Sequence, residues 1–291
     1  MSERDDDVVI DITDAALARQ ALYDRLVSSS PTGELIIDLR DEVLDSIAEL
    51  APTGRTLPGG PSVSGRPPEL LEGHRLQVIS GGDRWMDAEA FVYDCYVKLG
   101  YTNESSRKQV EELVRFAERS RFHAVVNEDD DIVGTTRVIF GTFDELPVGK
   151  FTRIDFFDEE PMAELSSIVV DPSRRSTGVI EHLYRSGWAD AITSGARTIT
   201  GLGERWMLDT FRYSYALPFV PCGVPEFYMG GDVIPMTMSA RPHIMSETAR
   251  CNPQFWLWAV EILTDEQIAE LGYEGTIELA QAIVGASARQ D

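Results

Sequence analysis

The sequence predicts an α/β protein whose core is one mixed β-sheet, and three observations support that prediction. From His74 to Ser239, short apolar runs typical of strands alternate with longer segments in which apolar residues recur at helical spacing. Two of the runs flank the polar stretch 127–131, whose Asn and Asp residues favour a solvated hairpin turn over a metal-binding motif. A third run, 163–170, leads directly into a turn and a helix.

The elements of this domain follow from its pattern of apolar residues and turns. A short strand at 76–79 precedes a helix that Asp83 caps and that carries Trp85 and Phe91 on its apolar face. The later elements are expected in this order: a helix at 106–119, strands at 122–126 and 132–140, the strand at 163–170, a helix from about 175 to 194, a strand at 197–202, a helix at 204–213, and a strand pair near 218–220 and 233–239.

The regions on either side of this domain have a different character. Residues 1–52 are expected to form helices, and a stretch rich in Pro and Gly follows, so residues 1–72 are interpreted as a helical extension with a linker. Residues 73–239 form the main domain. Residues 240–291, with an aromatic segment at 255–260 and a closing helix at 264–284, are interpreted as a C-terminal helical cap.

Composition limits the possible partners. The 291 residues are 43% hydrophobic, enough for a packed core, and the net charge of −23 argues against nucleic acid or an anionic membrane as the main partner. No apolar stretch is as long as the roughly 20 residues of a membrane span. The first seven residues are acidic where a secretory signal would be basic, so a cytoplasmic protein is expected.

Cysteine and histidine spacing indicates neither a metal site nor a disulfide framework. The three cysteines, Cys95, Cys222 and Cys251, are widely separated, and none has a histidine beside it in the sequence. The four histidines show no metal-ligand spacing. We therefore expect reduced thiols, no metal and no covalent intermediate on cysteine.

Glu164 lies within the apolar run 163–170, where a carboxylate needs a physical reason. The run delivers it just before a turn and a helix N-terminus, whose backbone N–H groups suit a pyrophosphate. A carboxylate beside such a site is placed to take a proton from an amine. The alternative is a glutamate on an edge strand that faces solvent, and the strand pattern leaves both interpretations open.

Three arginines near these elements are candidates for binding or for ion pairs. Arg174 and Arg175 precede the helix and are placed to pair with phosphate, although a surface ion pair with an acidic neighbour, Asp171 or Glu181, is the alternative. Arg137 lies mid-strand between apolar residues, where an unpaired cation is costly. It is therefore expected to have a carboxylate partner, with Glu164 as the candidate.

The order of elements over residues 74–239 resembles that of the GNAT acyltransferase superfamily. In that fold the fourth strand bulges and leads into a pyrophosphate-binding turn of the form Arg/Gln-x-x-Gly-x-Gly/Ala. This chain has Arg175-Ser176-Thr177-Gly178-Val179-Ile180, so the first glycine matches and an isoleucine replaces the last one.

Two motifs are similar to those of the branch that contains acyl-homoserine lactone (autoinducer) synthases and long-chain N-acyl amino acid synthases. Glu164-Leu165-Ser166 resembles the Glu-x-Ser of its catalytic strand, and Gly134-Thr135-Thr136-Arg137 resembles the segment that carries its third-strand arginine. Position 167 holds Ser where lactone synthases have Arg, so the resemblance does not extend to a homoserine-type acceptor.

The resemblance implies a set of site residues. Glu164, with Ser166, is the expected catalytic base, acting directly or through a water, and Tyr213 or Tyr215 is either the acid for the leaving thiolate or a core residue. The backbone near Ile168 is the expected oxyanion donor, and Arg137 and Trp85 are expected to bind substrate. The expected donor-binding residues are Ile168, Val169, Val170, Arg174, Arg175, Ser176, Thr177 and Gly178.

The implied activity is direct transfer of a medium or long acyl chain from an acyl-CoA or acyl-carrier-protein thioester to an amine of an amino acid, peptide or related metabolite. An acidic carrier protein requires a local basic patch, for which Arg174, Arg175 and Arg185 are candidates. The aromatic residues Trp85, Phe91, Phe211, Phe219 and Phe227 line an acyl tunnel or belong to the core. The alternatives are an acetyl-CoA-dependent N-acetyltransferase acting on a small molecule and a non-catalytic acyl- or CoA-binding protein.

Overall fold

A computed structural model of the chain describes residues 66–153, 161–174, 177–287 and 289, all within the second of the two units into which the chain divides, residues 51–291. The helices expected within residues 1–52 lie outside the described residues. So do Arg175 and Ser176 of the expected phosphate-binding turn.

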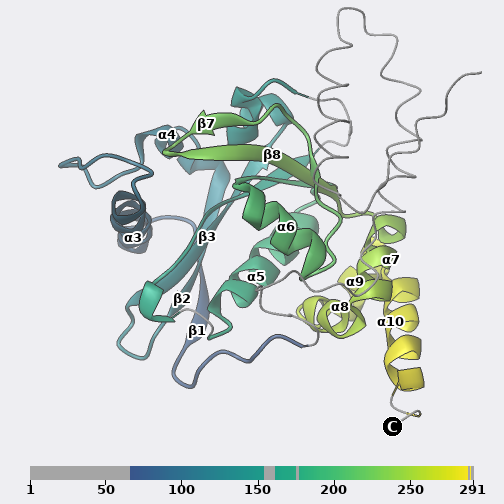
Figure 1. Cartoon of the computed structure of the whole chain (residues 1–291). Coiled ribbons are helices and arrows are strands. Elements are labelled where there is room, and N and C mark those ends of the chain that lie inside the picture. Colours follow the sequence, from purple (N-terminus) through teal and green to yellow (C-terminus); the bar gives the residue numbers. More distant parts are fainter. Residues whose placement is uncertain (1–65, 154–160, 175–176, 288, 290–291) are drawn as a thin grey trace, which may run out of the picture. The chain divides into compact units, whose positions relative to one another are not determined.

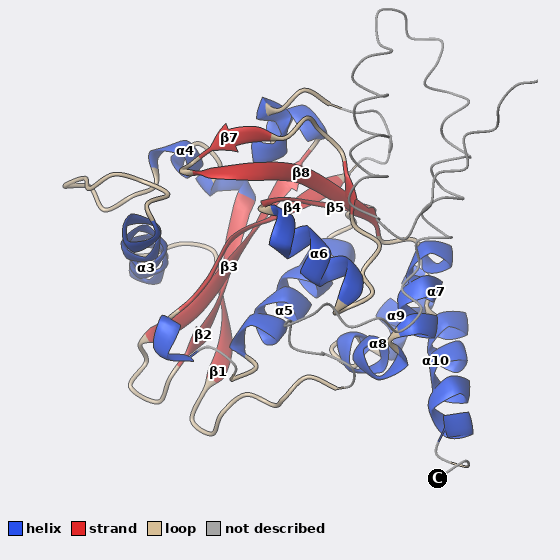
Figure 2. Cartoon of the chain, viewed as in Figure 1, coloured by secondary structure: helices blue, strands red, loops and turns tan. Residues whose placement is uncertain are grey.

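A mixed eight-stranded sheet forms the centre of the fold, as the sequence predicts (Figures 1 and 2). Its strands lie in the order β1-β2-β3-β4-β5-β8-β6, with β7 paired to β8, and only β4 and β5 run parallel. The strands are β1 (Arg75–Ile79), β2 (Ser120–Val126), β3 (Ile132–Gly141), β4 (Met162–Val170), β5 (Thr198–Gly203), β6 (Val220–Pro221), β7 (Glu226–Tyr228) and β8 (Gly231–Ser239).

Helices cover both faces of this sheet, and none of the described helices is both long and apolar enough to cross a membrane. The α-helices are α3 (Asp83–Leu99), α4 (Glu111–Val114), α5 (Val179–Thr193), α6 (Arg205–Tyr213), α7 (Pro242–Cys251), α8 (Pro253–Val260), α9 (Asp265–Leu271) and α10 (Glu274–Ser287). Short 3-10 turns lie at Ala117–Arg119, Phe143–Glu145, Pro147–Lys150 and Pro172–Arg174.

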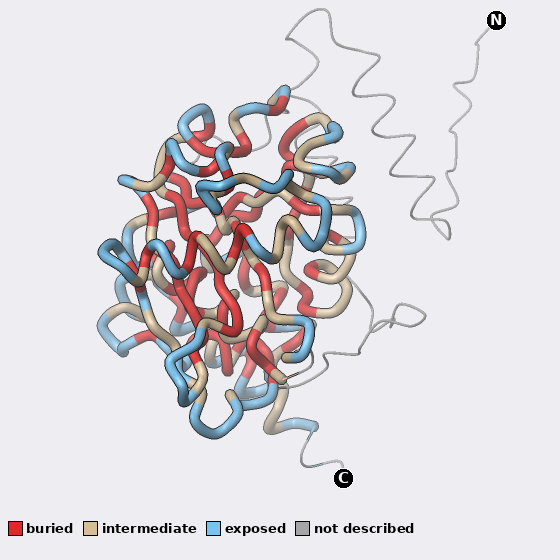
Figure 3. The backbone as a smooth tube through the Cα atoms, turned by 90° about the vertical axis from the view of Figure 1, so that its left-hand side faces the viewer, coloured by how far each residue is buried: buried red, intermediate tan, exposed pale blue. Residues whose placement is uncertain are grey.

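The alternation of side chains along β3 and β4 separates two apolar clusters. On one face, Trp85 of α3 packs against Phe122 of β2, with ring centroids 4.7 Å apart. On the other face, Gly187 of α5 comes close to the side chains of Leu165 and Val138. The central strands and the inner sides of both helix layers are buried, as Figure 3 shows along the backbone.

Three element predictions were wrong, and a backbone feature accounts for each. The helix expected at 106–119 is only the short α4 and a 3-10 turn, because Lys108 has a positive φ of 49° and ends a turn there. The closing helix expected at 264–284 is split into α9 and α10 by Gly272 (φ 73°), a left-handed C-cap. Asp83 is the first residue of α3 but not its cap, which is Gly82 without a side-chain hydrogen bond.

The parallel strands β4 and β5 pair over only three positions, which end at Glu164 and Thr200. β4 also departs from its ladder with β3, since Thr135 pairs with Val169 and Arg137 pairs with Ser166. Two residues of β4, Ser167 and Ile168, therefore face one residue of β3, the pattern of a bulge. Beyond Glu164 the two central strands diverge, and this divergence positions the site described next.

Candidate functional site

A cavity of about 920 Å³ lies where β4 and β5 diverge. Its walls come from β4, β5, β8, α3, α5, α6, α7 and α8, and most of the lining side chains are apolar. This volume is near the upper end of the roughly 300–1,000 Å³ found for small-molecule sites. The cavity is large enough for a ligand with a long apolar part.

The bulge in β4 forms one edge of the cavity. Ser167 has a positive φ of 50°, rare for a residue other than glycine, and its carbonyl accepts a hydrogen bond from Thr135 Oγ1 at 3.1 Å. Ser166, Ile168, Val169 and Val170 line the cavity on either side of it. Strained positions of this kind gather at binding sites, where the backbone turns its groups toward a ligand.

Glu164 is a buried residue of a central strand, with only 1% of its surface exposed. The alternative of a solvent-facing edge-strand glutamate is therefore wrong. Its Oε2 accepts a hydrogen bond of 2.8 Å from the backbone N–H of Val148. Burial raises the pKa of this carboxyl to about 8, and the Val148 N–H opposes the shift. A carboxyl with such a pKa exchanges its proton near neutral pH.

Glu164 lies just behind the cavity wall. It does not line the cavity itself, but its neighbours Leu165 and Ser166 do, and so does Pro147, which precedes its hydrogen-bond donor. The negative charge of Glu164 contributes to raising the pKa of two phenols on the cavity surface, Tyr96 and Tyr228. Burial raises the pKa of Tyr96 to about 12, with a smaller contribution from Glu164.

Arg137 is almost completely buried among aromatic rings. Its Nε donates to Ser120 Oγ at 2.8 Å, and its guanidinium lies 5.1 Å from the ring centroid of Trp85. Burial lowers its pKa to about 10, and the negative charge of Glu89 opposes this shift. No ion pair with Glu164 is found among the described residues, so the expected partner was wrong. Neither Arg137 nor Trp85 lines the cavity.

The N-terminus of α5 borders the cavity at Gly178, whose φ of 80° favours glycine. Among the described residues, no side chain accepts a capping hydrogen bond from the first turn of the helix. A Cβ atom on Gly178 would lie 2.7 Å from the carbonyl oxygen of Pro68, which is also 3.1 Å from His182 Nε2. The segment that begins at Arg66 therefore packs directly against this helix end.

Basic side chains are found in the cavity lining, although the protein is acidic overall. Arg66, Lys98, Arg174 and Arg185 all line the cavity. Within the described part of the chain Arg174 makes no ion pair, so the surface pair with Asp171 or Glu181 is not observed there. The Thr177 hydroxyl donates a hydrogen bond of 2.5 Å to the Arg174 carbonyl oxygen, and this bond fixes the orientation of the Thr177 side chain.

Only one of the two tyrosines expected to act as an acid reaches the cavity. Tyr215 lines it and donates a hydrogen bond of 3.2 Å to Glu181 Oε1, and burial raises its pKa. Tyr213 does not line the cavity. Sequence reasoning missed Tyr96 and Tyr228, because Tyr96 shares the apolar face of α3 with core residues and Tyr228 lies in the unexpected strand β7.

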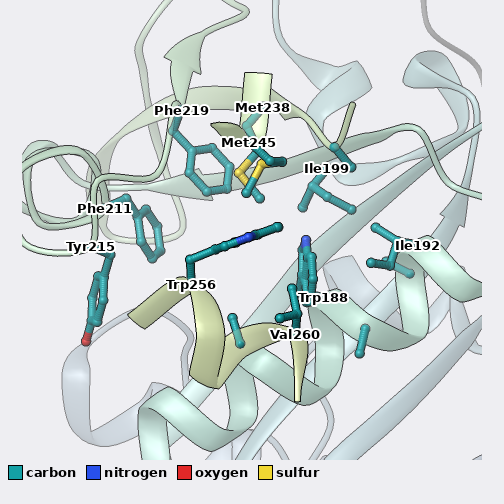
Figure 4. Packing of buried hydrophobic residues seen from close by; sticks show 14 of the residues in the cluster. Trp188, Ile192, Ile199, Phe211, Tyr215, Phe219, Met238, Met245, Trp256 and Val260 are labelled. Carbon is teal, nitrogen blue, oxygen red and sulfur yellow. The ribbon is translucent and has the colours of Figure 1, made fainter. Parts of the chain in front are cut away.

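The C-terminal helices supply one wall of the cavity. Met245 of α7 and Phe255, Trp256 and Trp258 of α8 line it together with Trp188 of α5. Figure 4 shows these helices meeting in a cluster of aromatic and methionine side chains. Of the five aromatics proposed for a tunnel, Phe211 and Phe219 line the cavity, whereas Trp85, Phe91 and the 74% exposed Phe227 do not.

A second polar cluster has the composition of a Ser–His–Asp triad. His123 of β2 lies 2.6 Å from Ser186 Oγ through Nδ1 and 2.9 Å from Asp190 Oδ2 through Nε2. His123 belongs to β2 and Ser186 and Asp190 to α5, and none of the three lines the cavity described above. His123 and Ser186 are buried, and the cluster links α5 to the sheet through its hydrogen bonds.

Comparison with known proteins supports the fold. No family model and no curated protein matches the sequence. Among solved structures, the chain is similar to the CoA-dependent acyl-homoserine lactone synthase BjaI in complex with SAM and isopentyl-CoA. The match has a TM-score of 0.50 and 16% identity and covers 61% of this chain and 88% of the other.

Two further solved structures are similar at lower scores. One is FeeM, an N-acyl amino acid synthase from uncultured soil microbes (TM-score 0.45, 14% identity, 66% of this chain and 98% of the other). The other is the CoA-dependent acyl-homoserine lactone synthase MesI (TM-score 0.46, 17% identity, 62% and 95%). The likeness to BjaI shows that the chain has a GNAT-like fold, as the order of its elements predicts.

Proposed function

We propose that the protein is an N-acyltransferase that moves a medium or long acyl chain from a pantetheine thioester directly to an amine. The observation that carries this proposal is a large apolar cavity that opens at a strand divergence, with a buried carboxyl of pKa about 8 just behind its wall. The fold shared with a CoA-dependent acyltransferase supports the same assignment.

The donor would lie along the divergent part of β4 with its phosphate at the start of α5. Arg174 and the N-terminal turn beginning at Gly178 would supply positive charge and N–H groups there. The remaining residues expected from the sequence to bind the donor, Arg175, Ser176 and Thr177, are proposed for the same role. The backbone from Ile168 to Val170 would bind the pantetheine arm and the oxyanion beside the bulge.

Glu164 is the proposed base. The amine attacks the thioester carbonyl and loses one proton, which Glu164 accepts through a water, because the carboxylate lies behind the wall. Collapse of the tetrahedral intermediate breaks the C–S bond, and Tyr215 would return a proton to the leaving thiolate. Ser166, which lies on the cavity surface two residues from Glu164, would hold the water.

The acceptor is proposed to be an amino acid, a peptide or a related amine. Nη2 of Arg137 is buried and has no hydrogen-bond partner in the described residues, and Arg137 lies opposite Ser166 in the sheet. A carboxylate of the acceptor would supply the missing partner of Arg137. Because neither Arg137 nor Trp85 lines the cavity, this contact requires the Trp85 side chain to move aside. The size of the cavity favours a long-chain donor over the alternative of acetyl-CoA.

The proposal is tested by free-thiol release from acetyl-, octanoyl- and palmitoyl-CoA and from the matching acyl-carrier-protein thioesters, with a pool of amines. Turnover that rises with chain length is expected. A preference for acetyl-CoA would instead identify a small-molecule acetyltransferase. Donor binding without turnover would identify a non-catalytic binding protein. Comparing the turnover of acyl-CoA with that of the matching acyl-carrier-protein thioester identifies the preferred donor.

A further inference from the structure

The segment that leads into β1 connects α8 to α5 along the cavity wall. Its residues Arg66, Pro67 and Pro68 all line the cavity, and Pro67 is buried. Arg66 Nη1 makes an ion pair of 2.6 Å with Glu261, the residue that follows α8. Figure 2 shows the segment starting beside α8 and running on into β1. Residues 66–69 are called the strap below.

The strap meets the first turn of α5 through the carbonyl oxygen of Pro68. This oxygen accepts a hydrogen bond of 3.1 Å from His182 Nε2, and a Cβ atom on Gly178 would lie 2.7 Å from it. The strap therefore fills the space that the missing side chain leaves at Gly178. The donor phosphate is proposed to bind at this same helix end. An oxygen of the strap and the oxygens of the phosphate would repel each other there.

The contacts that hold the strap against the protein are few and lie near solvent. The side chains of Arg66 and Glu261 are 50% and 46% exposed, and an ion pair with such exposure contributes little to stability. Arg66 also pairs with Glu69, but this contact lies within the strap. The strap belongs to no helix or strand, and its two consecutive prolines stiffen it. It can thus leave α5 as one piece at a small cost.

The chain directly after the strap is fixed and provides a hinge. Leu70 packs against the apolar cluster that contains Val179 and Leu183 of α5. A turn closed by the hydrogen bond from His74 N–H to the Leu71 carbonyl oxygen then leads into β1. Rotation before Leu70 would separate Pro68 from His182 without disturbing the sheet.

We propose that the strap is an autoinhibitory gate, which closes the donor site between α5 and α8 in the free protein and is displaced when the donor phosphate binds at the start of α5. The inference rests on the proposed acyltransferase function and adds a mode of regulation to it. The apparent donor affinity is then the intrinsic affinity multiplied by the fraction of molecules with an open strap. A change that loosens the strap should therefore strengthen donor binding.

Glu261→Gln tests the gate, because it breaks the ion pair with Arg66 and Glu261 itself does not line the cavity. The affinity for octanoyl-CoA, measured by titration calorimetry, should rise about two- to fivefold, the usual effect of one exposed ion pair, while kcat for thiol release stays the same. Glu111→Gln is the matched control. It removes the same charge and another exposed ion pair, with Arg107, and should leave the affinity unchanged.

Limited digestion with a glutamyl endopeptidase follows the strap itself. This second readout is needed because Glu261 also lies 3.9 Å from Arg185, which lines the cavity. A protease needs an extended segment free of the protein surface, so saturating octanoyl-CoA should speed cleavage after Glu69 several-fold. Glu261→Gln should speed this cleavage without any ligand. Cleavage after Glu118, in the 3-10 turn Ala117–Arg119, is the internal control and should not change.

Slower or unchanged cleavage after Glu69 with octanoyl-CoA would overturn the inference, because the strap would then close over the donor or stay in place. Equal affinities of Glu261→Gln and wild type would overturn it too, as would a failure of octanoyl-CoA to bind either protein. Faster cleavage without thiol release would keep the gate and contradict the acyltransferase function. Thiol release with an unaffected strap would contradict the gate alone, so the two failures are distinguishable.

Discussion

The chemistry proposed here depends on how the surroundings of Glu164 set its protonation. The carboxyl is buried beside apolar strands and receives one backbone N–H, from Val148, so its ionised form is disfavoured and its pKa rises to about 8. Arg137 offers no compensating ion pair to it in the described residues. The pKa of Glu164 therefore suits a group that takes up a proton during the reaction.

This pKa predicts how activity depends on pH. Because the base must be ionised, kcat/KM for thiol release should rise with pH and level off above an apparent pKa near 8. The measurement uses an acceptor amine whose own pKa lies well below that of Glu164, so that only the protein titrates. A flat profile across this range would contradict the role of Glu164.

The same carboxyl should lower stability when it ionises. The folded protein holds its proton up to a pH of about 8, whereas an unfolded glutamate releases it near 4.5, so this group makes the free energy of unfolding fall as pH rises between these values. Glu164→Gln removes the titration. Urea unfolding at pH 5 and pH 9 should show the variant gaining stability over the wild type at the higher pH, and an equal difference at both would argue against the raised pKa.

At the scale of elements, the sequence was most informative where a pattern is local. The hairpin of β2 and β3, the strand β4 and the helix α5 follow from apolar periodicity and turn residues. The three-residue β7 was missed because a strand so short shows no alternation, and Phe227 within it is exposed. Boundaries such as the one between α9 and α10 depended on a single left-handed glycine.

The N-terminus of α5 provides a prediction at this scale. Gly178→Ala places a Cβ where φ is 80° and where the Pro68 carbonyl oxygen would be 2.7 Å away. We expect a loss of about 1–3 kcal/mol in the free energy of unfolding, together with weaker donor binding. Gly275→Ala, in α10 with nothing within 4 Å of the added Cβ, is the control and should be neutral or stabilising. Similar results for the two variants would contradict this account.

For the molecule as a whole, the main lesson is that the cavity is assembled from segments far apart in the sequence. Glu164 and the divergent strands were accessible to motif reasoning, since they lie in one stretch of chain. The positions of Trp188 and Trp258 in the cavity wall could not be predicted. An aromatic residue at helical spacing predicts only a core position, and the cavity beside it is formed by the tertiary fold. The boundaries at residues 72 and 239 stay predictions.

The contribution of α7 and α8 to the cavity predicts that these helices set the acyl chain length. Met245, 1% exposed, lines the cavity from α7, and Met245→Trp would fill part of it. The preferred donor should shorten, at a cost of about 1–3 kcal/mol in stability from overpacking. Met86→Trp, on the exposed side of α3, is the control. An unchanged chain-length profile in Met245→Trp would place the acyl chain elsewhere.

The most direct test of the central claim is the turnover number of Glu164→Gln for thiol release from the preferred donor, measured together with its donor affinity. Glutamine keeps the size of the side chain and an acceptor for the Val148 N–H, so donor binding should be retained while kcat falls by about 10²- to 10⁴-fold. A variant that retains wild-type turnover would contradict the account and leave Glu164 as a purely structural residue.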